Sequence, residues 1–143
     1  MKKTLSPMLF KFFSIAEPHL FSTDSPFSFK TVTYYKVKPG RLNEFVALWK
    51  KSAQPIYKEL VAQGHLLSFK ARSPLYQSTG SNRWDMKVEL TYKTEEAAFD
   101  EVARTQAVNK VFRDADAYRR TQAHLAEVVL AQWAVKATNF ILN

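Results

Sequence analysis

The sequence predicts an α+β, ferredoxin-like fold, in which β-α-β-β-α-β elements build one antiparallel sheet. Two strand-like segments, residues 31–38 and 84–92, are each followed directly by a segment with helical spacing of apolar residues. The two strand–helix units also echo each other, because Tyr-Lys closes each strand and each helical segment carries a Phe. An alternating or apolar strand-like segment follows each helical region, which completes two halves of the same plan.

Composition limits the classes of protein and site. With 143 residues, of which 46% are hydrophobic and 24% charged, the chain has the size and composition of one globular domain. The absence of cysteine excludes disulfides, thiolate nucleophiles and cysteine-based metal sites. The net charge of +8 is scattered without a long basic run, so neither nucleic acid nor membrane is an expected partner. No segment approaches the ~20 apolar residues of a membrane-spanning helix.

The N-terminal segment has a different texture from the rest of the chain. It holds three of the six prolines, with clustered Phe and Ser. Lys2-Lys3 and Ser14-Ile15-Ala16 fit a secretory signal peptide with its cleavage site, whereas Pro7 and Lys11 interrupt the apolar region that such a peptide needs. Export and a disordered leader therefore stay equal alternatives, and so do exported and cytoplasmic localisation. The predicted division is a leader (1–30), a folded domain (31–137) and a C-terminal tail (138–143).

The first strand–helix unit is the clearest. Residues 31–38 are rich in β-branched and aromatic residues, and Pro39-Gly40 ends the strand. Apolar residues then recur at helical spacing from Leu42 to Leu60, which predicts that Trp49 is buried against the sheet. Pro55 interrupts this pattern and predicts either a kink or a second helix that starts near Ser52.

The second half follows the same logic. Residues 65–72 alternate as a second strand, and residues 84–92 give the cleanest alternation in the chain. Thr94 is a predicted N-cap for a helix whose apolar stripe includes Phe99 and Val102. Residues 114–127 are helical or looped. The last strand, 127–136, is apolar on both faces apart from one glutamine, which predicts a central position in the sheet.

Four segments carry a resemblance to known proteins. They are YKVKPGRLNEFVALWKK (35–51), QGHLLSF (63–69), WDMKVELTYKTEEAAFD (84–100) and VVLAQWAVKA (128–137). Together they resemble the dimeric α+β barrel superfamily, which includes antibiotic biosynthesis monooxygenase-like proteins, over residues 31–137. The resemblance implies a homodimer of paired sheets with the helices outside and a pocket between the sheet and helices of each subunit. No position matches the Asn/Trp/His set of the haem-degrading branch, so no catalytic residue and no cofactor is carried over.

The candidate site residues come from the parity of the strands. If the apolar face of the third strand meets the helices, polar side chains gather on the other face, which becomes interior in a paired barrel. There they serve either a structural role or an anionic ligand. The catalytic residues are undetermined, with His65 and Tyr34 as candidates, and no metal site is expected. The predicted ligand-binding residues are Tyr34, Lys36, Lys70, Lys87, Glu89 and Gln132.

Three functions fit these observations. The first is a small-molecule-binding dimeric barrel protein without a recognised reaction. The second is a cofactor-independent monooxygenase or isomerase that acts on an aromatic or polyketide-like substrate. The third is a non-catalytic assembly protein. The sequence leaves open whether the protein is an enzyme, and it specifies neither substrate nor pathway.

Overall fold

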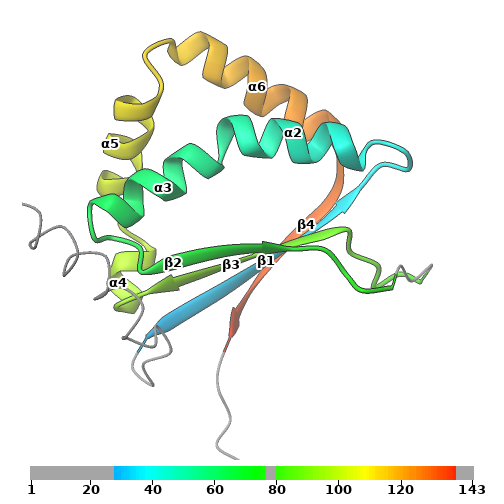
Figure 1. Cartoon of the computed structure of the whole chain (residues 1–143), viewed down its shortest axis with the longest axis horizontal. Coiled ribbons are helices and arrows are strands. Elements are labelled where there is room, and N and C mark those ends of the chain that lie inside the picture. Colours follow the sequence, from blue (N-terminus) through cyan, green and yellow to red (C-terminus); the bar gives the residue numbers. More distant parts are fainter. Residues whose placement is uncertain (1–27, 77–79, 138–143) are drawn as a thin grey trace, which may run out of the picture.

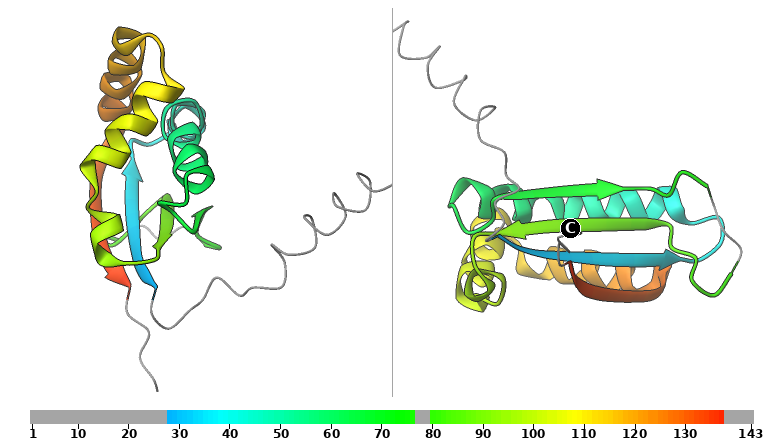
Figure 2. Two further views of the ribbon diagram at one scale, coloured as in Figure 1. Left: turned by 90° about the vertical axis from the view of Figure 1, so that its left-hand side faces the viewer. Right: turned by 90° about the horizontal axis from the view of Figure 1, so that it is seen from below.

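The computed structural model describes residues 28–76 and 80–137. Its strands form one sheet in the order β2-β3-β1-β4, in which each neighbouring pair is antiparallel. The helices cover one face of this sheet, and the other face is open (Figures 1 and 2). The predicted α+β, ferredoxin-like fold is therefore confirmed. The elements are β1 (Phe29–Val37), α2 (Leu42–Ser52), α3 (Gln54–Ala62), β2 (Ser68–Arg72), β3 (Met86–Tyr92), α4 (Glu95–Ala98), α5 (Glu101–Val111), α6 (Ala115–Val128) and β4 (Val129–Ala137).

The first strand–helix unit folds as its sequence predicts. Gly40 adopts a φ of +76°, in the left-handed region that glycine enters without strain, and this turn carries the chain from β1 into α2. The helical region is divided after Ser52, and α3 begins anew with Pro55 in its first turn. Of the two predicted alternatives, the second helix is the one observed. At this position the proline has no intrahelical hydrogen bond to lose.

The core lies between the helical layer and the sheet. Phe45 is fully buried and Trp49 is 3% exposed, which confirms the predicted burial of Trp49. From β3, the side chains of Met86, Val88 and Leu90 point to the same layer and are buried. The side of the sheet that faces the helices is therefore the apolar side of β3, as its alternation predicts.

The second helical region differs from its prediction. Phe99 and Val102 were predicted to lie on the buried stripe, and both are exposed. The reason is a break in the helix: α4 ends at Ala98, and Asp100 caps a new helix by accepting a hydrogen bond from the backbone N–H of Ala103 (3.0 Å). In α5 the buried residues are Ala103 and Ala107. The predicted N-cap at Thr94 is confirmed, since its hydroxyl accepts from the Ala97 N–H (3.2 Å).

The position of β4 was also predicted wrongly. It is an edge strand that pairs with β1, and its residues are largely exposed. The central position belongs to β1, which pairs with β3 on one side and with β4 on the other. The apolar side chains of β4 thus lie on surfaces that nothing in the described part of the chain covers. Trp133 and Val135 are the large apolar side chains of this strand that point to the open face.

The folded domain begins slightly earlier than predicted. Phe29 opens β1, is 8% exposed and belongs to the core, so the boundary lies before Phe29 rather than at residue 31. The rest of the predicted leader, residues 1–27, and the predicted tail, 138–143, lie outside the described residues and stay predictions. Among residues 28–76 and 80–137, no helix has both the length and the apolar composition that crossing a membrane requires.

Candidate functional site

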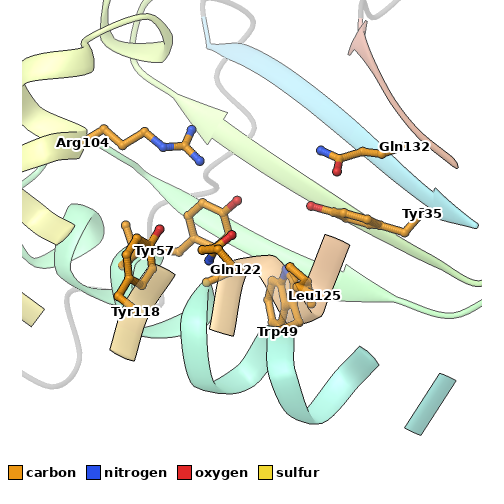
Figure 3. Close-up of a pocket in the computed structure, with 10 residues that line it drawn as sticks. Tyr35, Trp49, Tyr57, Arg104, Tyr118, Gln122, Leu125 and Gln132 are labelled. Carbon is orange, nitrogen blue, oxygen red and sulfur yellow. The ribbon is translucent and has the colours of Figure 1, made fainter. Parts of the chain in front are cut away.

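A cavity of about 130 Å³ lies between the sheet and the helices (Figure 3). Side chains from two strands, β1 and β4, and from four helices, α2, α3, α5 and α6, converge on it. The cavity therefore exists only when both layers are in place. Most of its wall is aromatic or polar. The lining residues are Tyr35, Trp49, Ala53, Ile56, Tyr57, Arg104, Tyr118, Gln122, Leu125 and Gln132.

The sheet contributes a phenol and an amide. Tyr35 of β1 and Gln132 of β4 lie directly opposite each other in the strand register, so both side chains point to the helix-covered face. Figure 3 shows both groups at the same side of the cavity. The parity argument placed Gln132 on the open face, and this expectation was wrong. Lys36 pairs with Ala131 and Val37 with Val129, so β4 has one extra residue at this point. This bulge reverses the face to which the following residues of β4 point.

Aromatic neighbours hold the two buried tyrosines of the cavity in place. The Tyr35 ring packs on Phe45, with 5.1 Å between ring centroids. The Tyr57 ring lies between Trp49 (6.0 Å) and Phe69 (5.7 Å). Because each ring is fixed by packing rather than by solvent contact, the hydroxyl groups are held in position before any ligand binds.

The opposite wall comes from α5 and α6. Arg104 of α5 extends its guanidinium toward the cavity, and Tyr118 and Gln122 of α6 lie across from it (Figure 3). The Tyr118 ring stacks on Phe112, with 4.6 Å between centroids and 27° between planes. Phe112, which lies in the connection between α5 and α6, thus holds the third cavity phenol, Tyr118, in place.

Burial controls the protonation of the cavity phenols. It raises the pKa of Tyr35 and of Tyr57 above the usual value for tyrosine. The charge of Arg104 opposes this rise at both groups without cancelling it. Both phenols are therefore neutral at physiological pH and present O–H donors to the cavity.

The Trp49 indole leaves a buried donor. It lies near enough to the Tyr35 hydroxyl to lower the pKa of that group, against the larger effect of burial. Within the described ranges, however, no acceptor lies in hydrogen-bonding geometry to its Nε1 atom. Since buried N–H groups in proteins are almost always bonded, an unfilled donor at a cavity wall favours an acceptor inside the cavity.

The remaining ligand-binding candidates lie on the open face, as predicted. Tyr34 is opposite Lys87 in the register, and Lys70 is opposite Glu89. Lys36 follows Tyr34 by two positions on the same face. Lys87 Nζ lies 3.0 Å from Glu89 Oε1. Partial burial opposes ionisation of Glu89, but its hydrogen bond to Lys87 and the neighbouring charges outweigh this and lower its pKa.

An aromatic cluster on this open face was not predicted. The Tyr34 ring stacks on Trp133, with centroids 5.5 Å apart and planes 13° apart, and meets Trp84 edge-on at 5.6 Å. With Ser81, Asn82 and Val135 these rings border an open groove of about 510 Å³. We call Tyr34, Trp84 and Trp133 the sheet-face cluster.

Trp84 joins this cluster because the alternation of β3 does not extend to its first residues. Parity placed Trp84 with the helix-facing side chains and Asp85 on the open face. Instead Asp85 is buried and accepts the Val37 N–H at Oδ2 (2.8 Å), and Arg83 donates to the Val37 carbonyl (2.8 Å). These bonds fix the chain before β3, and β3 itself begins only at Met86.

The two catalytic candidates, His65 and Tyr34, are not brought together. His65 lies just after Gly64, and its backbone N–H donates to the Leu60 carbonyl at the end of α3 (2.9 Å). Its side chain borders a separate space of about 20 Å³, which holds little more than one water molecule. Tyr34 points to the open face. Neither residue lines the main cavity.

The described part of the chain contains no group of three or more metal-ligating side chains. His124 contacts Glu44 Oε1 at 2.6 Å. Glu44 also accepts two hydrogen bonds from Arg41 (2.7 and 2.8 Å). This cluster joins α2 to α6, the helix that carries one wall of the cavity. The bonds from Arg41 and then from His124 lower the pKa of Glu44 to about 2.

Most of the cavity residues escaped the sequence prediction, although signals for them exist. Tyr57 and Tyr118 were not among the predicted site residues. Arg104 directly follows Ala103 and precedes Ala107 by three positions, so it borders the buried side of its helix. A basic residue next to the buried alanines of a helix is the sequence signal that could have identified Arg104 as a cavity residue.

Comparison with known proteins shows the fold alone. No protein-family model matches the chain, and no curated protein matches it. Among solved structures it is similar to a dimeric ferredoxin-like protein from an uncultured marine organism (TM-score 0.54, 13% identity, 85% of this chain and 97% of that chain covered). It is also similar to a protein of Arabidopsis thaliana (TM-score 0.51, 14% identity, 80% of this chain and 98% of that chain covered). A third similar structure is a putative antibiotic biosynthesis monooxygenase of Bacteroides thetaiotaomicron (TM-score 0.50, 13% identity, 84% of this chain and 94% of that chain covered).

The depressed pKa of Glu44 predicts an acid-sensitive attachment of α6. A carboxyl whose pKa is lower in the folded than in the unfolded chain stabilises the fold above its unfolded value of 4.5 and loses this effect as the pH falls toward 2. The difference in free energy of unfolding between the wild type and Glu44→Gln should shrink as the pH falls from ~4.5 to ~2. Urea unfolding at a series of pH values measures it.

Glu101→Gln is the matched control for this experiment. Glu101 is exposed and has no ion pair within the part of the chain that the structure describes. A Glu44→Gln curve that runs parallel to the wild-type curve down to pH 2 contradicts the assignment.

Proposed function

We propose that this chain is a small-molecule-binding protein that works as a homodimer of ferredoxin-like subunits, with the cavity between sheet and helices as its binding site. The observation that carries the proposal is the buried Trp49 N–H, which has no complete hydrogen bond and borders a cavity whose phenols are already fixed. A ligand with an acceptor atom satisfies this donor. Rigid aromatic walls with a few convergent polar groups are typical of small-molecule sites.

The open face of the sheet supports the dimer. In a single chain it leaves Trp133 and Val135 partly exposed beside the stacked ring of Tyr34. Aromatic residues are enriched in protein interfaces, and an apolar strand at an exposed edge is a liability unless it is covered. One similar structure is described as a dimeric ferredoxin-like protein. A second copy of this chain, open face to open face, is the occupant that these observations favour.

In this arrangement the open-face residues that were predicted to bind a ligand line the interior of the paired barrel. Glu89 balances part of the positive charge there through its contacts with Lys87 (3.0 Å) and Arg72 (3.8 Å). Satisfied charges of this kind are compatible with burial, whereas unpaired ones are costly. The set proposed for this interior is Tyr34, Lys36, Lys70, Lys87 and Glu89.

A second candidate function is catalysis without a cofactor. The neutral hydroxyls of Tyr35 and Tyr57 are donors on buried side chains at the cavity wall, and such donors stabilise negative charge that develops on a substrate oxygen. One similar structure is named a putative antibiotic biosynthesis monooxygenase. These observations support a monooxygenase or isomerase that acts on an aromatic or polyketide-like substrate.

The binding site is tested by filling the cavity. Ala53→Leu places a larger side chain in the wall and should weaken the binding of one-ring compounds at least ~10-fold, because the ligand loses its space. A panel of neutral, acidic and basic one-ring compounds, measured by calorimetry and ligand-observed NMR, provides the affinities. Ala126→Leu, at an exposed position of α6, is the control and should leave them unchanged.

If no compound of the panel binds the wild type, the small-molecule proposal fails and the assembly protein is the reading that survives. If a compound binds equally well to wild type and Ala53→Leu, its site lies elsewhere on the protein.

Catalysis is tested by oxygen uptake and product formation with anthrone-like and quinol substrates. Tyr35→Phe removes one donor and should lower turnover ~10²-fold, within the range seen when one oxyanion donor is lost. Tyr76→Phe removes a hydroxyl from an exposed ring and should have no effect. Binding of such a compound without oxygen uptake or isomerisation excludes the second candidate.

The dimer is tested by placing a charge on the sheet-face cluster. Trp133→Glu should weaken self-association at least ~100-fold, because it removes an aromatic anchor and buries two like charges. Sedimentation at micromolar concentration should report twice the chain mass of 16.5 kDa for the wild type and the chain mass for the variant. Val102→Glu, an exposed apolar position in the helical layer, should remain dimeric. A monomeric wild type refutes this assembly.

A further inference from the structure

We infer that the ligand of the cavity is a planar organic carboxylate about the size of one aromatic ring, held through its carboxylate by Arg104. The inference rests on the proposed small-molecule site and adds to it the charge, the size and the orientation of the ligand.

The first argument is the charge of the lining. Arg104 is the one ionised side chain among the residues that border the cavity, and the lining contains no Asp, Glu, Lys or His. The phenols of Tyr35 and Tyr57 stay neutral because burial disfavours their ionised forms. The lining therefore carries a net positive charge, and because Arg104 is exposed, this charge lies where the cavity meets solvent.

The second argument is that Arg104 has no carboxylate partner among the described residues. Three basic residues of the helical layer form ion pairs, Arg41 with Glu44, Lys110 with Glu59 and Arg119 with Asp116. Within the described ranges Arg104 forms none, like Lys51 and Arg113, but it is the one of these that borders the cavity. Asp100 and Glu101 lie one turn before Arg104 on the same helix, yet neither forms an ion pair with it. The Asp100 side chain instead caps α5 through the Ala103 N–H.

The third argument is the balance of donors and acceptors. Arg104 and the Trp49 indole can only donate hydrogen bonds. Arg104 interacts with the hydroxyl of Tyr57, and Trp49 with that of Tyr35, but both hydroxyls still need an acceptor for their own protons. Gln122 and Gln132 supply acceptors, but each also brings two N–H donors. A carboxylate offers several lone pairs and no donor, so it fits this donor-rich wall better than an alcohol, an amine or an amide does.

The orientation and size follow from the walls. Figure 3 shows the guanidinium at one end of the space, with the rings of Tyr57 and Tyr118 near it and those of Trp49 and Tyr35 further along. The volume of about 130 Å³ is close to that of an engineered apolar cavity of ~150 Å³ that holds benzene. A single ring fills this space, with its carboxylate at the arginine end and its face against the aromatic walls.

Benzoate and benzamide test the inference, since they have nearly the same shape but differ in charge. Wild-type protein should bind benzoate at least ~10-fold more tightly than benzamide, because a hydrogen bond to a charged group contributes more than a neutral one. Arg104→Met should weaken benzoate binding ~10–100-fold and leave benzamide binding within twofold. Arg104→Lys, which keeps the charge but loses the planar fork, should retain part of the preference.

Arg113→Met is the matched control, because it removes the same charge from an exposed position outside the cavity. It should leave both affinities unchanged. If benzamide binds as tightly as benzoate, or if Arg104→Met and Arg113→Met have equal effects, the inference is overturned while the binding site stands. If neither compound nor any other of the one-ring panel binds, the proposed function fails, and the inference fails with it.

Discussion

The central position of β1 is the constraint on which the rest of the structure depends. Because β1 hydrogen-bonds to β3 and to β4, neither of its edges is free. Each of its side chains points either to the helices or to the open face. Tyr35 therefore points to the helices and its neighbour Tyr34 to the open side. Two adjacent tyrosines thus serve two different surfaces, one in the cavity and one in the sheet-face cluster.

The cavity depends on contacts that lie outside it. Its floor is the sheet, but its walls belong to helices that are held in place by other groups. The cluster of Arg41, Glu44 and His124 joins α6 to α2, and the stacking of Phe112 on Tyr118 supports the start of α6. A polar attachment of this kind fixes a helix without filling the space beneath it with apolar side chains. This is one physical reason why a cavity persists at this side of the molecule.

Local sequence patterns were sufficient for the fold class and for most of the elements. Pro39-Gly40, Pro55 and Thr94 act through the few residues around them, so their effects could be predicted from the sequence. The same holds for the alternation from Met86 to Leu90 in β3, although not for the two residues before it. The edge position of β4 could not be predicted in this way, because an apolar strand has the same composition whether helices or a second subunit cover it.

The site was harder to predict because it depends on register. The placement of Gln132 was wrong since a bulge in β4 changes its alternation, and nothing in the local sequence marks the bulged residue. Trp84 and Asp85 exchanged their expected roles because Asp85 bonds to Val37, which lies 48 positions earlier in the chain. Arg104 belongs to the cavity through the packing of α5, a helix that begins only after the break at Asp100.

The bulge in β4 also restricts how this protein can diverge. Gln132 faces the cavity and Trp133 faces the open side, so one short strand carries the chemistry of both surfaces in alternation. Insertion or deletion of a single residue between the bulge and Gln132 would exchange the two, and would place an indole in the cavity and an amide in the aromatic groove. Descendants of this chain can vary these two surfaces by substitution, whereas length changes within β4 alter both at once.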